Sequence, residues 1–246
     1  MKILVCISKT PDTTSKVAFT NDGKDFNQEG INFIMNPYDE WYALVRAVEL
    51  KEKNGGSVTV INVGPASNEI IIRKALAIGA DDAVRVDVEP ISPYHVAVQI
   101  AEFAKQSQFD LIFTGKETID YNGSSVGAMI AELLDWPFVS YASKLEQDGD
   151  HFIATREIEG GVEILQLAAP FVLSAAKGLA EQRIPNMQGI MMSKRKPLVV
   201  VPPVEVDSRV EILNHVLPPG KKGVKMVQPD EMDELVRMLH EEAKVI

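Results

Sequence analysis

The sequence has a single cysteine, no long apolar run and fewer basic than acidic residues. Cys6 cannot form a disulfide within this chain, and one thiolate cannot build a multi-cysteine zinc or iron–sulfur site. No stretch approaches the roughly 20 apolar residues that span a bilayer, and the N-terminal apolar run is too short for a signal peptide. We therefore expect a cytoplasmic protein without direct membrane insertion.

The charge balance and the spacing of the histidines argue against nucleic-acid binding and against a metal site. With 35 acidic and 25 basic side chains the formal net charge is −10, which disfavours extended nucleic-acid binding. The four histidines have no metal-ligand spacing, so we predict no metal site, and no acid–base or covalent catalytic group stands out. Hydrophobic residues make up 46% of the 246 residues, enough for one large globular core.

Short β-branched runs alternate with helical patterns over the first 140 residues. Strands are expected at 3–7, 57–63, 83–86 and 109–114, and helices at 37–53, from Ser67 to Gly79, from Ser92, and at 126–134. Asn36 and Ser67 are the predicted helix caps, with Pro37 at the first helical position. This alternation predicts an α/β fold with a doubly wound, mostly parallel sheet.

The pattern changes after Pro137. Turn-rich residues 145–150 and 159–161 flank two β-type runs, 151–158 and 162–167, which predict an antiparallel β ribbon added to the sheet. Residues 176–196 lack a regular apolar stripe and are expected to be irregular and exposed. We predict a nucleotide-binding domain over 1–200 and a proline-rich C-terminal arm over 201–246 with a helix near its end.

Three segments follow predicted strands, where open parallel sheets bind ligands. They are 6–11, 63–66 and the glycine- and serine-rich loop 115–127. Glycines with hydroxyl and amide donors at a helix start are typical of phosphate cradles, so an adenine mononucleotide site is one reading. The other is that these residues only cap and turn the chain. Neither the Gly-x-Gly-x-x-Gly fingerprint nor a P-loop is present.

Two other patterns carry alternatives. Gly123 to Gly127 matches Gly-x-Ser-x-Gly, which would make Ser125 the nucleophile of a serine hydrolase, although a long polar loop separates Ser125 from the preceding strand. Met187, Ile190, Met191 and Met192 stand beside the basic run 194–196. Such soft apolar side chains either bind partners adaptably or pack in the core.

Longer motifs make the sequence recognisable. Residues 156–167, REIEGGVEILQL, followed by PFVLS at 170–174, closely resemble the signature of the electron transfer flavoprotein β subunit family. The resemblance extends over the chain through MNP at 35–37, VGP at 63–65, ALAIGAD at 75–81, LDWP at 134–137 and GVK at 223–225.

This resemblance implies a Rossmann-like fold of the adenine nucleotide alpha-hydrolase type and a role as electron carrier, not enzyme. It implies a heterodimer with an α subunit that holds most of the redox FAD, while this chain buries AMP and its C-terminal arm wraps the partner. Electrons would pass from flavin dehydrogenases, such as those of fatty acid oxidation, to a quinone oxidoreductase or another acceptor. In electron-bifurcating members a second FAD replaces AMP, and this alternative stays open.

The resemblance also assigns residues. The AMP contacts it implies are Cys6, Asn36, Pro37, Tyr38, Asp39, Val63, Gly115, Lys116, Asp120, Tyr121, Asn122, Gly123, Ser124, Ser125 and Val126. The partner-docking segment is 183–196, with Met187 as its apolar anchor and Ile190, Lys194 and Arg195 beside it. Thr13 stands where mammalian members have a tyrosine near the flavin, and the loop at 121–123 departs from their acidic one.

Overall fold

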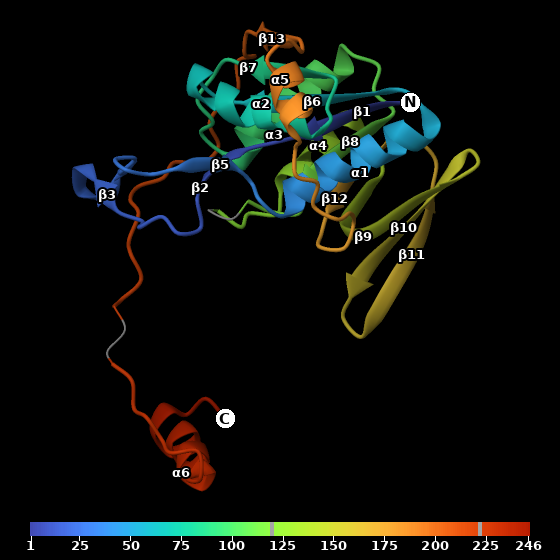
Figure 1. Ribbon diagram of the computed structural model, residues 1–246. Helices are drawn as coiled ribbons and strands as arrows, with labels where there is room; N and C mark the ends of the chain where they lie inside the picture. The colour runs from blue at the N-terminus through green and yellow to red at the C-terminus, as the bar shows by residue number, and fades with distance from the viewer. Residues whose placement is uncertain (119–120, 221–222) are drawn as a thin grey trace. The chain divides into compact units, whose positions relative to one another are not determined.

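A computed structural model describes residues 1–118, 121–220 and 223–246, and the chain divides into two compact units (Figure 1). The larger unit contains Met1–Val17 and Gln28–Ile212, and the smaller contains Ala18–Asn27 and Leu213–Ile246. The larger unit carries the central sheet and every described residue of the predicted nucleotide site.

A nine-stranded sheet in the order β11-β10-β9-β12-β8-β1-β6-β7-β13 forms the centre of the larger unit. Its parallel strands are β1 (Lys2–Cys6), β6 (Ser57–Val63), β7 (Asp82–Val86), β8 (Leu111–Gly115), β12 (Phe171–Ala175) and β13 (Leu198–Val201). The β1 strand is buried on both faces, as a short continuous apolar run predicts. The predicted doubly wound parallel sheet is confirmed.

Helices cover both faces of this sheet. Ile3 and Val5 of β1 pack in one apolar cluster with α1 (Asp39–Asn54) and α2 (Glu69–Ile78). Leu4 and Cys6, which alternate with them, pack in a second cluster with α3 (Pro93–Lys105) and α4 (Val126–Leu134). Successive side chains of a strand point to opposite faces, so one strand supplies both cores.

The predicted ribbon is confirmed, and a third strand that was not expected adjoins it. The strands β10 (His151–Ile158) and β11 (Gly161–Leu167) pair antiparallel, and β9 (Phe138–Asp148) joins them to the parallel part of the sheet. Figure 1 shows β10 and β11 extending beyond the helices. The expected turn at 145–150 is wrong in its first part, because Leu145 is a fully buried position of β9.

Both predicted helix caps are wrong, whereas the predicted start of a helix at Ser92 is confirmed. The α1 helix begins at Asp39, not at Pro37, because the Asn36 amide donates to the Glu117 carbonyl oxygen instead of capping a helix. Ser67 lies within a 3-10 turn, Ala66–Asn68, that precedes α2. Ser92 does cap α3, since its hydroxyl accepts from the His95 N–H at 3.1 Å.

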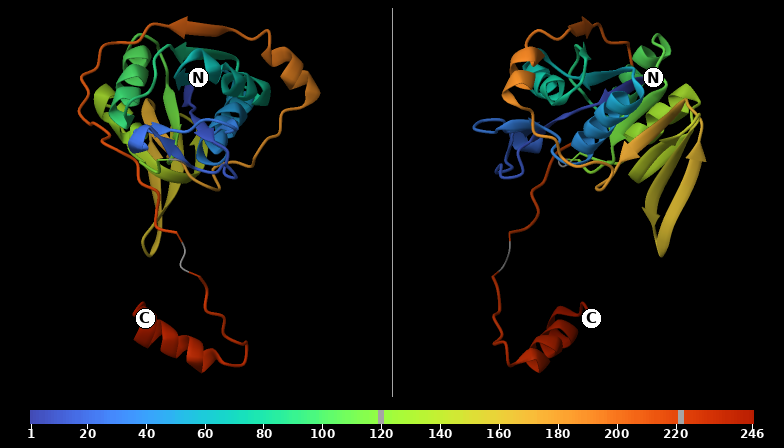
Figure 2. Two further views of the ribbon diagram at one scale, coloured as in Figure 1. Left: turned by 90° about the vertical axis from the view of Figure 1, so that its left-hand side faces the viewer. Right: turned by 45° about the vertical axis from the view of Figure 1, so that its right-hand side comes forward.

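The segment 176–196 is mostly exposed, as predicted, but Leu179 packs in the core, and the segment contains a helix that was not expected. This helix, α5 (Met187–Ser193), is capped by the Asn186 side chain, which accepts from the Gly189 N–H at 2.7 Å. Figure 2 shows α5, in orange, beside α2 and just before the chain enters β13. A short pair of strands, β2 (Lys9–Pro11) and β5 (Phe33–Met35), completes the larger unit.

The smaller unit has a hairpin and a C-terminal helix. The hairpin strands β3 (Phe19–Thr20) and β4 (Asp25–Phe26) flank a 3-10 turn at Asn21–Gly23, and the Phe19 ring stacks on His215 at 4.9 Å. The predicted final helix is confirmed as α6 (Met232–Arg237), which continues as a π-helical turn, Met238–Ala243. Among the described residues, no helix has both the length and the apolar character needed to cross a bilayer.

Replacing Leu111 with alanine tests the central core. Leu111 of β8 is fully buried in the cluster beneath α1, so its loss should lower the free energy of unfolding by about 2–5 kcal/mol. Exposed Ile70 is the matched control, and Ile70→Ala should change this free energy by less than about 0.5 kcal/mol. Urea unfolding measures both, and equal effects would contradict this account of the core.

Candidate functional site

The candidate site lies where the strand order of the parallel sheet reverses. From β1 the chain proceeds outward to β6 and β7, then returns to β8 on the other side of β1 and continues to β12. In open α/β sheets, ligands bind beyond the carboxyl ends of the strands at such a reversal. Cys6 and Gly115 end the two strands concerned, and Val63 ends the neighbouring β6.

The loop after β1 is fixed by the first turn of α1. The Glu40 carboxylate accepts from the Ser8 N–H at 2.7 Å and from the Ser8 hydroxyl at 2.6 Å. Glu40 is buried, so these hydrogen bonds to its carboxylate are shielded from bulk water. Charge-assisted hydrogen bonds are strong in such surroundings. This pair gives the chain leaving β1 one defined path past the crevice.

Residues 36–39 and 115–117 come together at the tip of β8. The Asn36 amide nitrogen donates to the Glu117 carbonyl oxygen at 2.8 Å, and the Glu117 N–H donates to Asp39 Oδ2 at 3.2 Å. Asn36 is almost completely buried, yet its Oδ1 has no hydrogen-bond partner in the described part of the chain. A buried acceptor without a donor is costly, so Asn36 Oδ1 points to a donor supplied by a ligand.

Gly115 is glycine for a steric reason. A Cβ at this position would lie 2.8 Å from Glu40 Cγ and 3.1 Å from the Glu40 backbone nitrogen. The end of β8 therefore passes directly against the start of α1. Gly127 in α4 is also close-packed, since its Cβ would lie 2.7 Å from the Thr114 hydroxyl.

The loop before α4 contains two residues with positive φ. Asn122 and Ser124 have φ values of 47° and 49°, in the left-handed region, and the Ser124 hydroxyl donates to Glu117 Oε2 at 3.3 Å. Ser125 stands at the N-cap of α4, but its side chain makes no capping hydrogen bond. The first-turn N–H groups of α4 thus lack a side-chain cap, as in many anion sites.

The pKa values of Asp39, Cys6 and Lys116 are shifted by burial and by neighbouring groups. Burial raises the pKa of Asp39, and the hydrogen bond from the Glu117 N–H opposes this only in part. Burial also raises the pKa of the Cys6 thiol, with Glu40 adding to the effect, so Cys6 stays neutral and is no nucleophile. The ion pair between Lys116 and Glu117, 2.9 Å long, raises the pKa of Lys116.

The other residues assigned to the nucleotide take different positions. The side chains of Cys6 and Val63 are buried in the core, so what they offer the crevice is backbone. Tyr38 and Tyr121 are exposed, while Pro37 turns its carbonyl toward Gln182, whose amide donates to it at 2.8 Å. Asp120 lies outside the described residues. Gly123 and Val126 flank the helix start.

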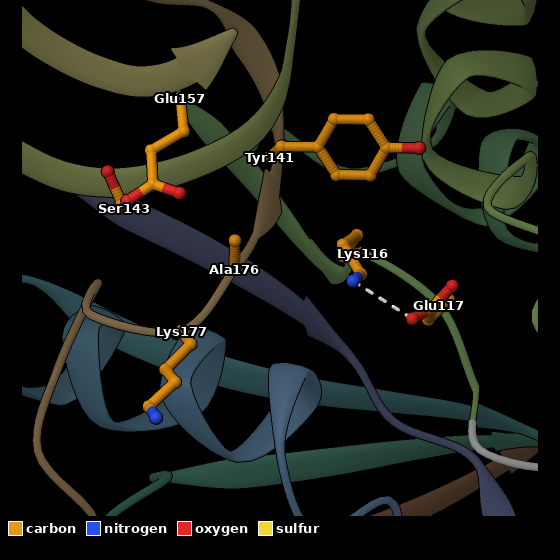
Figure 3. A pocket seen from close by; sticks show the side chains of 7 residues that line it. All are labelled: Lys116, Glu117, Tyr141, Ser143, Glu157, Ala176 and Lys177. Carbon is orange, nitrogen blue, oxygen red and sulfur yellow. Dashed lines mark ion pairs between the residues drawn. The ribbon is translucent and has the colours of Figure 1, made fainter. Parts of the chain in front are cut away.

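A cavity of about 380 Å³, which the sequence did not indicate, adjoins this site on the side of the ribbon (Figure 3). Lys116 and Glu117 of the loop after β8 meet Tyr141, Glu157 and Lys177 there. Tyr141 has a φ of 54°, rare for an aromatic residue, and its N–H donates to the Ser174 hydroxyl at 2.9 Å. The pairing of β9 with β12 shifts register here, so Tyr141 lies in a β-bulge. No local sequence motif predicts this bulge.

The predicted docking residues are brought together on α5. Met187 is 74% exposed, Ile190 and Met191 are exposed beside it, and Lys194 and Arg195 follow the helix on the surface. This exposure excludes the alternative that these methionines pack in the core. Ile184, three residues before α5, is 84% exposed.

Ser125 has none of the surroundings of a hydrolase nucleophile. It follows a loop and not a strand, and no hydrogen bond joins it to a histidine within the described residues. A nucleophile elbow needs a sharp turn directly from strand to helix and a base within reach. The geometry therefore gives the hydrolase reading no support.

The fold and the site define an open α/β protein whose strand order reverses between β1 and β8, the place where this class of sheet binds ligands. Comparison with known proteins is more specific. Residues 25–206 match the model of the electron transfer flavoprotein domain. The electron transfer flavoprotein subunit beta of Bacillus subtilis is 36% identical over 260 residues, and that of Homo sapiens is 33% identical over 256. These alignments span all of this chain and 100% and 99% of the relatives. The chain belongs to the electron transfer flavoprotein β subunit family.

Asp39→Asn tests the cost of the buried carboxyl. Because the pKa of Asp39 is raised above its unfolded value of 3.8, ionising it costs stability, and this cost appears as pH rises through the folded pKa. Asp39→Asn should therefore raise the melting temperature at pH 7, with a gain that shrinks toward pH 4. Asp12→Asn is the control, since hydrogen bonds from Thr14 lower the pKa of Asp12 and no such gain is expected. A pH-independent difference would contradict the assignment.

Proposed function

We propose that this chain is the β subunit of a heterodimeric electron carrier in which an α subunit holds the redox FAD and this chain binds AMP. The crevice at the tips of β1 and β8 carries the proposal. It combines a glycine pressed against α1, a buried acceptor without a donor, and a helix start without a side-chain cap. Family membership independently favours the pairing with an α subunit.

The residues of the crevice fit an adenylate in chemical type. Asn36 Oδ1 can accept a hydrogen bond from an exocyclic amine, and the backbone at the ends of β1 and β6 lies next to it along the same sheet edge. The Asn122 N–H already donates to the Thr118 carbonyl oxygen, but the N–H groups of residues 123–125 and of the first turn of α4 can donate to phosphate oxygens. Bound in this way, the nucleotide would stabilise the loop after β8 and would not react.

A carrier role agrees with the chemistry that the described residues offer. The thiol of Cys6 is buried and neutral, Ser125 has no base, and no group of three potential metal ligands occurs in the described part of the chain. Electron transfer through a bound flavin needs a held cofactor and partner surfaces, and no side-chain nucleophile. The buried thiol also favours a reducing compartment, for which we propose the cytoplasm.

The C-terminal arm, 201–246, is proposed to wrap the α subunit. It exposes Leu213, Val216, Val224 and Met226, each more than 70% accessible. Apolar side chains on an extended segment with few contacts of its own indicate a surface that a partner covers.

The apolar surface of α5 is proposed to dock flavin dehydrogenases, which donate electrons to the flavin. A quinone oxidoreductase or another acceptor is proposed to take these electrons from the flavin.

The nucleotide can be identified directly after release. Heating the co-expressed αβ protein should release one AMP per heterodimer together with the FAD of the α subunit, as measured by mass spectrometry. Two FAD molecules and no AMP would replace this proposal with the bifurcating alternative.

Gly115→Ala tests the steric fit of the site. It should reduce the AMP content of the αβ protein severalfold, because the added Cβ would meet Glu40. Gly220→Ala is the control, since its Cβ would meet nothing within 4 Å, and it should leave the AMP content unchanged.

Met187→Glu tests the docking surface. A carboxylate on the exposed anchor should slow reduction of the flavin by a partner flavin dehydrogenase by about tenfold or more, since a buried charge at an interface is costly. Association with the α subunit and the AMP content should not change. Ile184→Glu should act in the same direction. Ile91→Glu, an exposed position before α3, is the control, and an equal effect there would contradict the assignment.

A further inference from the structure

The segment that carries the exposed apolar residues is attached to the body of the protein at both ends. At its start, the Arg183 guanidinium makes two hydrogen bonds to the Glu52 carboxylate, at 2.7 and 2.9 Å. The Trp41 indole N–H donates to the Arg183 carbonyl oxygen at 3.2 Å. Both partners lie on α1, so this end is tied to the helix that also borders the crevice.

Arg73 of α2 holds the other end. Its Nη1 donates to the Ser193 carbonyl oxygen at 2.9 Å and to the Lys196 carbonyl oxygen at 2.8 Å. Its Nε and Nη2 donate to Glu69 Oε1, which fixes the guanidinium in place. The carbonyl groups of a last helical turn lack partners within the helix, and Arg73 supplies a donor to that of Ser193, the last residue of α5.

The contact between α2 and α5 is reciprocal and close. The Lys196 ammonium, just after α5, donates to the Leu76 and Ala80 carbonyl oxygens at the end of α2. Gly189 lets the two helices meet, since a Cβ there would lie 2.5 Å from the Ala77 carbonyl oxygen. Each helix end thus receives donors from the other, and the backbones touch without an intervening side chain.

We propose that Arg73 is a positioning residue that holds α5 in the one orientation in which its apolar surface can dock a donor dehydrogenase. The proposal rests on the docking role of α5 proposed above. A helix of seven residues has no stability of its own in water, so its order depends on such contacts. Ordering it in advance removes an entropy cost from each encounter with a partner.

Steady-state kinetics of the co-expressed αβ protein separates this role from a merely structural one. Arg73→Gln should raise the KM for the donor dehydrogenase about three- to tenfold, as loss of a pre-ordered surface implies. The kcat at saturating donor, the flavin spectrum and the AMP content should stay within error of the parent. Lys105→Gln on α3 removes a helix-surface cation on the other face of the sheet and should leave the KM unchanged.

Two further variants test the same effect on the KM independently. Gly189→Ala should raise the KM as Arg73→Gln does, because it displaces α5 from α2 by another route. Arg73→Lys keeps one donor and should recover part of the loss. An unchanged KM in both Arg73→Gln and Gly189→Ala overturns the positioning role while docking by Met187 stands. A fall in kcat with loss of flavin or AMP also overturns it. If Met187→Glu itself has no effect, the proposed docking role fails as well.

Discussion

The close packing of β8 against α1 is the constraint on which the candidate site depends. Gly115 lies against Glu40, and Glu40 in turn fixes Ser8 in the loop after β1. The positions of the two strand ends at the strand-order reversal therefore depend on the buried Glu40 carboxylate and on the absence of a side chain at Gly115. Any bulkier residue at the end of β8 would move α1 and with it the buried Asn36 and Asp39.

The α1 helix also connects the crevice to the proposed docking segment. Its first turn borders the nucleotide site, while Trp41 and Glu52 hold the start of the segment that leads into α5. Arg73 and Lys196 complete the attachment from α2. The parts that would bind a nucleotide and a partner thus both contact the layer formed by α1 and α2.

Much of the fold could be predicted because strand and helix patterns alternate clearly from β1 to α4. The ribbon was recognisable from its turns, but its third strand, β9, was hidden because a bulge at Tyr141 breaks the alternation. Helix α5 was missed because its order comes from Arg73 and Gly189, tertiary contacts with no local pattern. Within the site, Asn36 is not the predicted helix cap, because its side-chain amide donates to the Glu117 carbonyl oxygen, a tertiary contact with no local pattern.

A crystal structure of the co-expressed heterodimer tests the central claim most directly. The account predicts one adenylate at the tips of β1 and β8, with its phosphate accepting from N–H groups of residues 123–127 and its base donating to Asn36 Oδ1. A crevice closed by the side chains of Asp39 and Glu117, with Asn36 satisfied by the protein itself and the nucleotide absent, would contradict it.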